Sequence, residues 1–290
     1  MSADRINQTL ILKDGRCLGF AEFGASTGQP VFHFHGAASS RLEHPSSEST
    51  LQQMGIRLIT VDRPGHGLSD FQPHRRLVDW PQDVLQLANH LGIGEFFVEG
   101  YSSGGPHALA CACLLPQRTL AGAVFGCVAP MNRPGAFRGM PFFNQVLARS
   151  ARWFPGLTQF VRRMMRRMVA GNFEETTRRL MSTIPESDKA ALYLPQNFEI
   201  FTTSVREGFR TGSRGVACDD ILINRAWGFD LVAIKPRIDL WHGEADVNVP
   251  VHAARYLQAK LPHSRLTLLP GKGHFYLFTC WLELLSGLVS

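Results

Sequence analysis

Gly100-Tyr101-Ser102-Ser103-Gly104 is the stretch of this chain that decides the fold. It follows a short apolar run at 96–98 and precedes 106–115, a segment rich in Ala, Leu and Cys with helical character. A Gly-x-Ser-x-Gly pattern between a strand and a helix is typical of a tight turn that presents a nucleophilic serine. The same pattern also occurs by chance as a glycine-rich turn that opens a helix, so the rest of the chain has to decide between the two.

The pattern itself indicates which serine is meant. A serine on so tight a turn has a strained backbone, and the residues two before and two after it must be small. Centring the pattern on Ser103 would place Tyr101 at the first of these small positions. We therefore predict that Ser102 is the nucleophile and that the backbone N–H of Ser103 faces the reacting carbonyl.

The chain has 290 residues, of which 44% are hydrophobic and 19% charged, as in an ordinary globular protein. We find no apolar run near the ~20 residues of a membrane helix and no signal peptide, so no integral membrane segment is expected. Six cysteines without a CxxC pattern favour a reducing compartment, and we predict a cytoplasmic protein. Nothing in the sequence indicates an oligomeric state.

The net charge of +6 is confined to one segment. Residues 131–229 carry a balance of +7, from 15 Arg and Lys against 8 Asp and Glu, which leaves −1 for the rest of the chain. A chain-wide basic surface for nucleic acid is therefore not expected.

Strand-like and helix-like segments alternate up to about residue 130 and again from about 230. Short Val-, Ile- and Phe-rich strands between helices predict an α/β fold with a parallel sheet covered on both faces. Residues 131–229 are helical in pattern and contain no convincing strand, so we expect a helical insertion in a doubly wound core formed by 1–130 and 230–290. Strands are predicted at 9–12, 16–23, 31–35, 57–61, 96–99, 120–128, 237–241 and 265–269, and helices at 41–54, 78–91, 103–115, 251–261 and 275–288.

A serine nucleophile needs a base, and the base needs an acid that orients it. In an open parallel sheet these groups lie in loops at the carboxyl ends of strands. Of eleven histidines, His274 follows the last predicted strand and opens the last helix. Asp246 leaves the preceding strand, with Glu244 as a poorer second choice for the acid. Each could singly be a capping residue, but together and in this order they predict a triad of Ser102, Asp246 and His274.

Two N–H groups are needed to bind the oxyanion that develops on the carbonyl oxygen. The first is predicted from Ser103. The second should come from the loop after an early strand, where His35-Gly36-Ala37 makes Ala37 the expected donor. His35 would then shape this loop, and Glu99 before the turn is expected to be a paired structural carboxylate.

Together these motifs, with Asp62-Arg63-Pro64-Gly65-His66-Gly67 and Val249-Pro250, resemble the α/β-hydrolase superfamily along nearly the whole chain. The resemblance implies a doubly wound, mostly parallel eight-stranded sheet with a helical cap at 131–229. It favours the esterase, lactonase and C–C hydrolase branch, because members with an Asp nucleophile would not carry Ser102. The loop after His35-Gly36 departs from the usual form, since it has neither the proline nor the second glycine.

The segment 160–169 places its apolar residues on one half of a helical wheel and its four arginines on the other. We weigh three interpretations of the apolar half: packing, lining of an acyl pocket, and contact with an anionic membrane. The predicted substrate contacts are Tyr101, Trp153, Met164, Met165 and Met168. We see no metal-ligand cluster, P-loop or dinucleotide motif and predict no metal and no cofactor.

The sequence thus predicts a serine hydrolase that cleaves a small, largely apolar carboxylic ester or lactone through an acyl-enzyme. A peptidase, a C–C bond hydrolase or a perhydrolase with the same triad stays open. A peptidase would need a carboxylate for the free amino terminus of its substrate, with Glu174, Glu175 and Glu207 as candidates. In a different class, the fold could serve as a ligand-binding receptor with a slow triad.

Overall fold

The structure is a computed structural model that describes residues 3–44, 47–180 and 184–290. Eight strands form one sheet in the order β1-β2-β4-β3-β5-β6-β7-β8. Strand β2 is antiparallel to both of its neighbours, and all other pairs are parallel. The predicted fold class is confirmed. The strands are β1 (Gln8–Ile11), β2 (Cys17–Gly24), β3 (Gln29–Phe34), β4 (Ile56–Val61), β5 (Phe96–Tyr101), β6 (Thr119–Phe125), β7 (Arg237–Gly243) and β8 (Ser264–Leu269).

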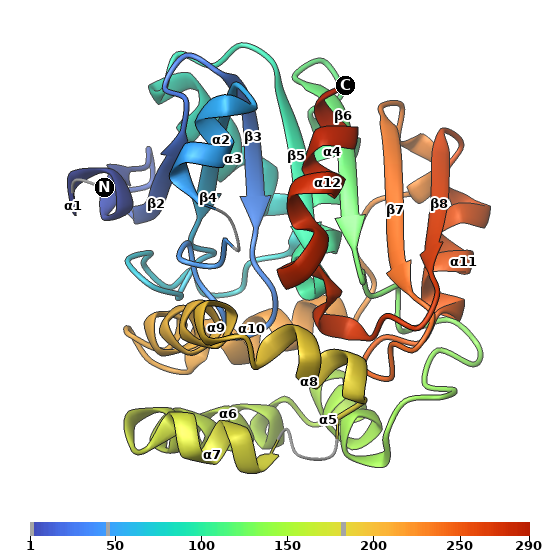
Figure 1. Ribbon diagram of the computed structural model, residues 1–290. Helices are drawn as coiled ribbons and strands as arrows, with labels where there is room; N and C mark the ends of the chain where they lie inside the picture. The colour runs from blue at the N-terminus through green and yellow to red at the C-terminus, as the bar shows by residue number, and fades with distance from the viewer. Residues whose placement is uncertain (1–2, 45–46, 181–183) are drawn as a thin grey trace.

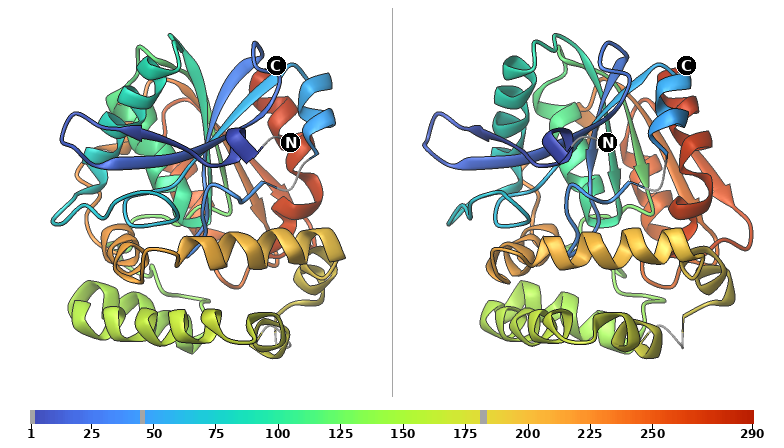
Figure 2. Two further views of the ribbon diagram at one scale, coloured as in Figure 1. Left: turned by 90° about the vertical axis from the view of Figure 1, so that its left-hand side faces the viewer. Right: turned by 60° about the vertical axis from the view of Figure 1, so that its left-hand side comes forward.

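Helices cover both faces of this sheet (Figures 1 and 2). On one face α3 (Trp80–His90), α4 (Gly105–Leu114) and α11 (His252–Lys260) contribute to one apolar cluster with the strands. On the other face α2 (Glu48–Gln53) and α12 (Leu277–Val289) contribute to a second cluster. Helix α4 is apolar nearly all round because it is buried along most of its length, which fits its place behind the centre of the sheet. A short helix α1 (Ala3–Ile6) precedes the first strand.

The helix predicted at 41–54 is shorter in the structure, where α2 is the only helix in the described parts of this range, 41–44 and 47–54. Arg41 is fully buried, and its backbone N–H and guanidinium both donate to the Asp62 carboxylate, at 2.7 and 2.8 Å. A buried carboxylate needs such donors. Because the Arg41 backbone N–H and side chain both bind Asp62, the chain around Arg41 forms a loop and not a helix. The sequence pattern around Arg41 gave no sign of this partner, because Asp62 lies 21 residues away.

Between β6 and β7 the described residues form six α-helices at the carboxyl end of the parallel strands (Figure 1). They are α5 (Phe142–Trp153), α6 (Pro155–Ala170), α7 (Phe173–Leu180), α8 (Glu186–Leu192), α9 (Pro195–Gly208) and α10 (Arg214–Ile223). We call residues 131–229 the cap segment, and its described residues contain no strand. Helices α9 and α10 lie next to the core, and α6 and α7 form a second layer beyond them (Figures 1 and 2).

Helix α6 is rotated relative to the prediction from the helical wheel. Arg162 was expected on the outer half, but it is buried and binds Asp220 of α10 through two bonds of 2.6 and 2.9 Å. Val169 is buried on the same face, whereas Met164 and Met168 are exposed. The prediction was wrong because a bidentate carboxylate on the neighbouring helix can hold an arginine inside, which amphipathicity alone does not reveal. None of the helices in the described ranges is long and apolar enough to cross a membrane.

Candidate active site

The turn after β5 carries Ser102 in a backbone conformation that few residues adopt. Strand β5 ends at Tyr101, the 3-10 turn η2 (Ser102–Gly104) follows, and α4 begins at Gly105. Ser102 has a φ of 52°, in the left-handed region that costs a non-glycine residue energy. A Cβ on Gly100 would clash with the Gly104 carbonyl, and one on Gly104 would clash with the Phe34 carbonyl. Both positions therefore require glycine, as the motif predicted.

Ser102, His274 and Asp246 lie together at the carboxyl ends of β5, β8 and β7. His274 Nε2 is 3.0 Å from Ser102 Oγ, and His274 Nδ1 is 2.6 Å from Asp246 Oδ2. The other Asp246 oxygen accepts the backbone N–H groups of Asn248 and Val249, both at 2.8 Å. All three side chains are buried. The carboxylate is thus fixed on one side and orients the imidazole with the other, as in a serine–histidine–acid triad.

The environment of His274 favours its protonated form. Burial alone would lower the pKa of the imidazole, but the charge and hydrogen bond of Asp246 outweigh it, and the pKa is raised above the ordinary value. An imidazole of raised pKa is a stronger base toward the serine proton. It also holds positive charge more readily once that proton has been taken.

The backbone around His274 is held by a core tyrosine and by a cap carboxylate. The Tyr101 hydroxyl donates to the His274 carbonyl at 3.1 Å, and the Phe275 N–H donates to Asp188 of α8 at 2.7 Å. Tyr101 is buried in the core below the turn, with its ring centroid 5.2 Å from that of His274. We therefore no longer place Tyr101 among the residues that contact substrate. Its position supports the histidine.

The loop after β3, predicted to supply the second oxyanion donor, is held through the peptide groups of Gly36. The Gly36 N–H donates to the buried carboxylate of Glu43 at 2.6 Å, and its carbonyl accepts Arg63 Nη2 at 3.0 Å. Ala38 has a φ of 54°, in the left-handed region that few residues other than glycine adopt. Ala37 itself is exposed between two buried neighbours. The chain thus keeps an unusual loop conformation by binding it on both sides.

Glu43 belongs to a buried chain of charges beneath this loop. His33 lies between Glu99, at 2.9 Å, and Glu43, at 3.6 Å, and Trp281 Nε1 donates to Glu99 at 3.0 Å. Burial lowers the pKa of His33, but the two carboxylates outweigh it and raise the pKa to about 9. Glu99 is therefore the paired carboxylate that the sequence led us to expect.

Asp219 of α10 is the centre of a second buried cluster, which sequence analysis missed. Arg63 Nε donates to Asp219 at 2.6 Å, Arg75 donates to its other oxygen, and His66 and His107 lie 3.5 and 3.8 Å away. Burial would raise the pKa of Asp219, but the two arginines hold it well below its ordinary value. The available signal was Arg63 in the Asp-Arg-Pro-Gly stretch, a buried arginine that needs a carboxylate.

The sequence pattern of the alpha/beta hydrolase family matches residues 31–285. This chain belongs to that family. Among curated proteins, a non-heme haloperoxidase of Rhodococcus erythropolis is 32% identical over 93 residues, which are 32% of this chain and 33% of that protein. The chain spans less than half the length of the curated relatives it matches first.

Solved structures of the same fold cover the whole chain. An esterase from Rhodococcus sp. ECU1013 is 22% identical with a TM-score of 0.70 and covers 98% of this chain and 99% of its own. Est816, described as an N-acyl homoserine lactone degrading enzyme, is 17% identical with a TM-score of 0.67 and covers 97% and 99%. At these identities the likeness concerns the fold.

The predicted substrate contacts in the cap segment of this alpha/beta hydrolase divide into two groups. Trp153, Met164 and Met168 are exposed. Met165 packs against a cluster of cap side chains that also contains Ala38 of the loop after β3. Phe201 of α9, which sequence analysis did not select, packs in the same cluster and also against Phe275, with ring centroids 5.7 Å apart. Met165 and Phe201 are therefore the better candidates for contact with a substrate.

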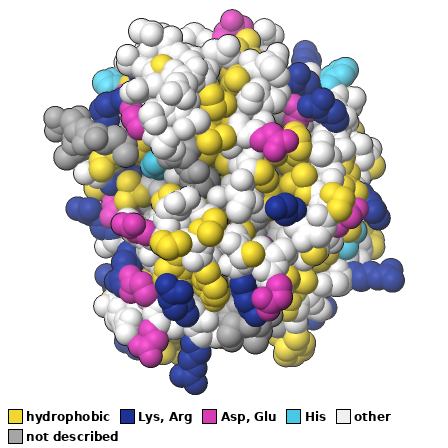
Figure 3. Space-filling view, in the orientation of Figure 1, with side chains coloured by type: hydrophobic (Ala, Val, Ile, Leu, Met, Phe, Trp, Pro, Cys, Tyr) yellow, Lys and Arg dark blue, Asp and Glu magenta, His cyan; other side chains and the backbone are white. Residues whose placement is uncertain are grey.

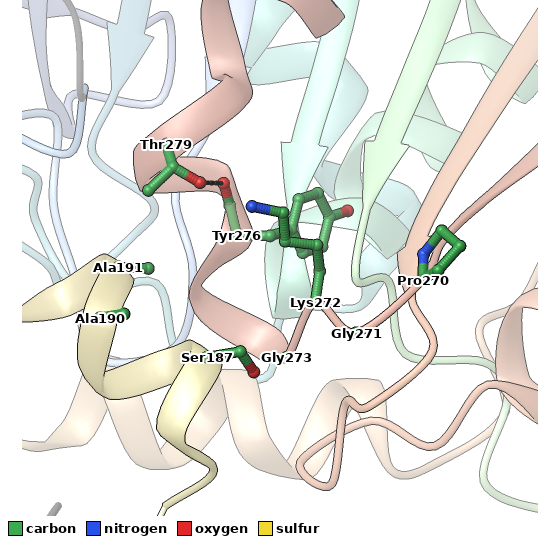
Figure 4. Close-up of a pocket in the computed structure, with 9 residues that line it drawn as sticks. All are labelled: Ser187, Ala190, Ala191, Pro270, Gly271, Lys272, Gly273, Tyr276 and Thr279. Carbon is green, nitrogen blue, oxygen red and sulfur yellow. Dashed lines mark hydrogen bonds between the residues drawn. The ribbon is translucent and has the colours of Figure 1, made fainter.

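A groove of about 270 Å³ lies on the outer side of the loop that carries His274 (Figure 4). It is bordered by Ser187 and Ala191 of α8, by the turn around Lys272 and by Tyr276 and Thr279. Ser102, Asp246 and His274 do not border it, so we do not assign the substrate to this groove. Among the residues that the structure describes, no group of three or more His, Cys, Asp or Glu side chains could hold a metal ion.

Proposed function

We propose that this chain is a serine hydrolase that cleaves a small, largely apolar carboxylic ester or lactone. The observation that carries the proposal is the pair of contacts of His274, 3.0 Å to Ser102 Oγ and 2.6 Å to Asp246 Oδ2. A serine within hydrogen-bond reach of an oriented imidazole is the arrangement that activates this weak nucleophile.

In the proposed reaction Ser102 Oγ attacks the carbonyl carbon while His274 Nε2 takes the hydroxyl proton. His274 then gives this proton to the leaving alcohol, and an ester bond to Ser102 remains. Water repeats the two steps on the acyl-enzyme with His274 again as the base. Asp246 keeps the Nδ1 proton directed toward itself and stabilises the imidazolium.

The negative charge on the substrate oxygen is assigned to the backbone N–H groups of Ser103 and Ala37. Ser103 lies in the turn that leads into α4, so its N–H lies at the positive end of the helix dipole. Ala37 follows Gly36, whose two peptide bonds are held by Glu43 and Arg63. Rigid donors of this kind suit oxyanion stabilisation, because they do not have to reorient as charge develops during the reaction.

The surroundings of the loop after β3 support an apolar acyl group. Met165, Phe201 and Ala38 lie in one apolar cluster, and Phe275 adjoins His274. The cap segment is then the part of the chain that selects the substrate, with 1–130 and 230–290 as the catalytic core. A cytoplasmic location stays a prediction from the sequence.

The three candidate carboxylates of the peptidase alternative have partners within the chain. Glu207 is bound to Arg41 at 2.7 Å, Glu174 to Arg206 at 2.7 Å, and Glu175 to Asn172 at 2.6 Å. Each therefore already has a partner other than a substrate amino terminus. C–C bond hydrolysis, perhydrolysis and a receptor with a slow triad use the same constellation, and substrate assays separate them from ester cleavage.

The test is a panel of p-nitrophenyl esters of increasing acyl length together with simple lactones. We expect Ser102-dependent turnover that is fastest for short to medium acyl chains. Turnover of aminoacyl p-nitroanilides without turnover of esters would instead favour the peptidase. Turnover too slow for an enzyme, with ligand-dependent binding of a second protein, would favour the receptor.

A further inference from the structure

The outer layer of the cap segment exposes a row of large apolar side chains. On α6, Leu157, Phe160, Met164 and Met168 recur at intervals of three and four residues, so they lie on one side of the helix. Their exposed fractions include 47% for Leu157 and 60% for Phe160. Trp153, the last residue of α5, and Phe154, which joins α5 to α6, continue the row and are exposed by 66% and 67%. We call these six residues the apolar stripe.

The apolar stripe lies in a segment whose charged residues are all arginines. Residues 131–173 contain eight arginines and no lysine, aspartate or glutamate. Arg163 and Arg167 are exposed on α6 on the side of the stripe, and Arg152 covers the Trp153 ring at 4.9 Å. The nearest carboxylates along the chain, Glu174 and Glu175 of α7, are bound to Arg206 and Asn172.

This surface faces away from the candidate active site. Helices α9 and α10 lie between α6 and the sheet, so α6 belongs to the outermost layer at the carboxyl end of the strands (Figures 1 and 2). At the same end of the molecule, seen at the bottom of Figure 3, Lys and Arg side chains project beside hydrophobic ones, with some Asp and Glu side chains among them.

We propose that the α5–α6 face of the cap segment docks on the surface of a lipid bilayer that contains anionic phospholipids. Aromatic, Leu and Met side chains can enter the boundary between headgroups and acyl chains, while arginines extend along them to the phosphates. A basic surface of this kind is attracted to anionic lipid, and each arginine near the membrane adds to the attraction. In this arrangement the helices lie on the bilayer surface and do not cross it.

The charge pattern favours a membrane over a second copy of this chain. A symmetric contact through α6 would place arginines opposite arginines, without a carboxylate in residues 131–173 to separate them. Nucleic acid would match the charge but would leave the apolar stripe in water. An anionic bilayer satisfies both features at once.

The test is flotation of the whole protein with vesicles of phosphatidylcholine alone or with about one-third phosphatidylglycerol. We expect binding to the anionic vesicles only, and weaker binding as the salt concentration rises. Leu157→Ser and Arg163→Glu should each lower the partition coefficient by about fivefold or more, and together by more than tenfold. Circular dichroism and turnover of a soluble ester should stay at the level of the unchanged protein.

Matched control substitutions are made at exposed positions outside the cap segment. Leu120 at the start of β6 is exposed by 46%, nearly the same fraction as Leu157. It lies at the end of the sheet away from the cap segment. Leu120→Ser and Arg255→Glu on α11 should leave vesicle binding unchanged. Tryptophan fluorescence gives a second readout, since Trp153 should shift to shorter wavelength on the anionic vesicles and Trp153→Phe should remove that shift.

Failure to bind anionic vesicles would overturn the proposal. So would binding that Leu157→Ser and Arg163→Glu reduce no more than the two control substitutions do. Sedimentation velocity distinguishes the rival occupant. A concentration-dependent dimer that Leu157→Ser abolishes, without vesicle binding, would assign the surface to a second copy.

Discussion

Arg63 and Asp219 join the loop after β4 to helix α10 of the cap segment through a buried bond of 2.6 Å. The same guanidinium donates to the carbonyls of His35 and Gly36, at the loop proposed to bind the oxyanion. The carboxylate of the cap segment thus orients the side chain that holds this loop. Close packing adds to the link, because a Cβ on Gly65 would lie 2.7 Å from the Cα of Gly215 in α10.

We therefore expect Asp219→Asn to lower kcat for a p-nitrophenyl ester by roughly tenfold to a hundredfold, with a small change in KM. Loss of one well-placed oxyanion donor costs about 10²-fold or more, and a displaced loop should lose part of this. Steady-state kinetics over a range of ester concentrations measure both constants.

Asp220→Asn is the matched control, because Asp220 is a neighbouring carboxylate of α10 that binds Arg162 within the cap segment. Both substitutions remove a buried ion pair and should lower the free energy of unfolding by similar amounts, about 3–5 kcal/mol at most. An equal loss of kcat in the two variants would mean that Asp219 acts only through stability.

The pH dependence of catalysis should report the raised pKa of His274. The base must be neutral to take the serine proton, so kcat/KM should rise with pH along a limb whose midpoint lies above the ordinary histidine value of about 6.5. Asp246→Asn should move this midpoint down and lower kcat by about 10³-fold or more. Glu244→Gln, in the same loop, should do neither. A wild-type midpoint below the ordinary value would contradict the assigned pair.

His33 should give the folded protein a pH-dependent stability. Its folded pKa of about 9 lies above the unfolded value, so protonation of His33 stabilises the folded state. This stabilisation is fully present below about pH 6.5 and is lost as the pH rises through 9. The largest contribution is on the order of 3 kcal/mol. Urea unfolding from pH 6 to 10 should show the difference between wild type and His33→Gln shrinking in this window. His90→Gln, at an exposed position on α3, should show no such trend.

Two adjacent methionines test which side of α6 meets the substrate. Met165 packs in the cluster that contains Ala38, whereas Met164 is 40% exposed. Met165→Ala should extend turnover to longer acyl chains by opening space beside the loop, and Met164→Ala should leave the chain-length profile unchanged. Ratios of kcat/KM for p-nitrophenyl acetate and longer esters measure this. Identical profiles for both variants would place the acyl group elsewhere.

Much of the core and the proposed triad follow from local patterns. Ser102 stands directly after β5, and Asp246 and His274 stand a few residues beyond the ends of β7 and β8. Parallel strands bring such positions to one edge of the sheet. The glycines at 100 and 104 could be predicted because the turn around Ser102 leaves space for nothing larger.

The interactions that the sequence did not reveal are pairings between distant charges. The first pair, Arg41 and Asp62, explains why the helix predicted at 41–54 is shorter. The second, Arg162 and Asp220, explains the orientation of α6. The third, Arg63 and Asp219, connects the cap segment to the loop after β3. Amphipathic patterns assign charged residues to the surface, and only the three-dimensional partner shows that an arginine is held inside. For this reason Trp153, Met164 and Met168 were assigned to a pocket but lie on the outer surface.

The most direct measurement is the hydrolysis of p-nitrophenyl acetate and butyrate by Ser102→Ala, with Ser103→Ala beside it. The hydroxyl of Ser103 is buried without a bond to His274, so only Ser102 should supply the nucleophile. The account predicts that Ser102→Ala lowers kcat by at least about a thousandfold and that Ser103→Ala retains most of the activity. Undiminished hydrolysis by folded Ser102→Ala would contradict it.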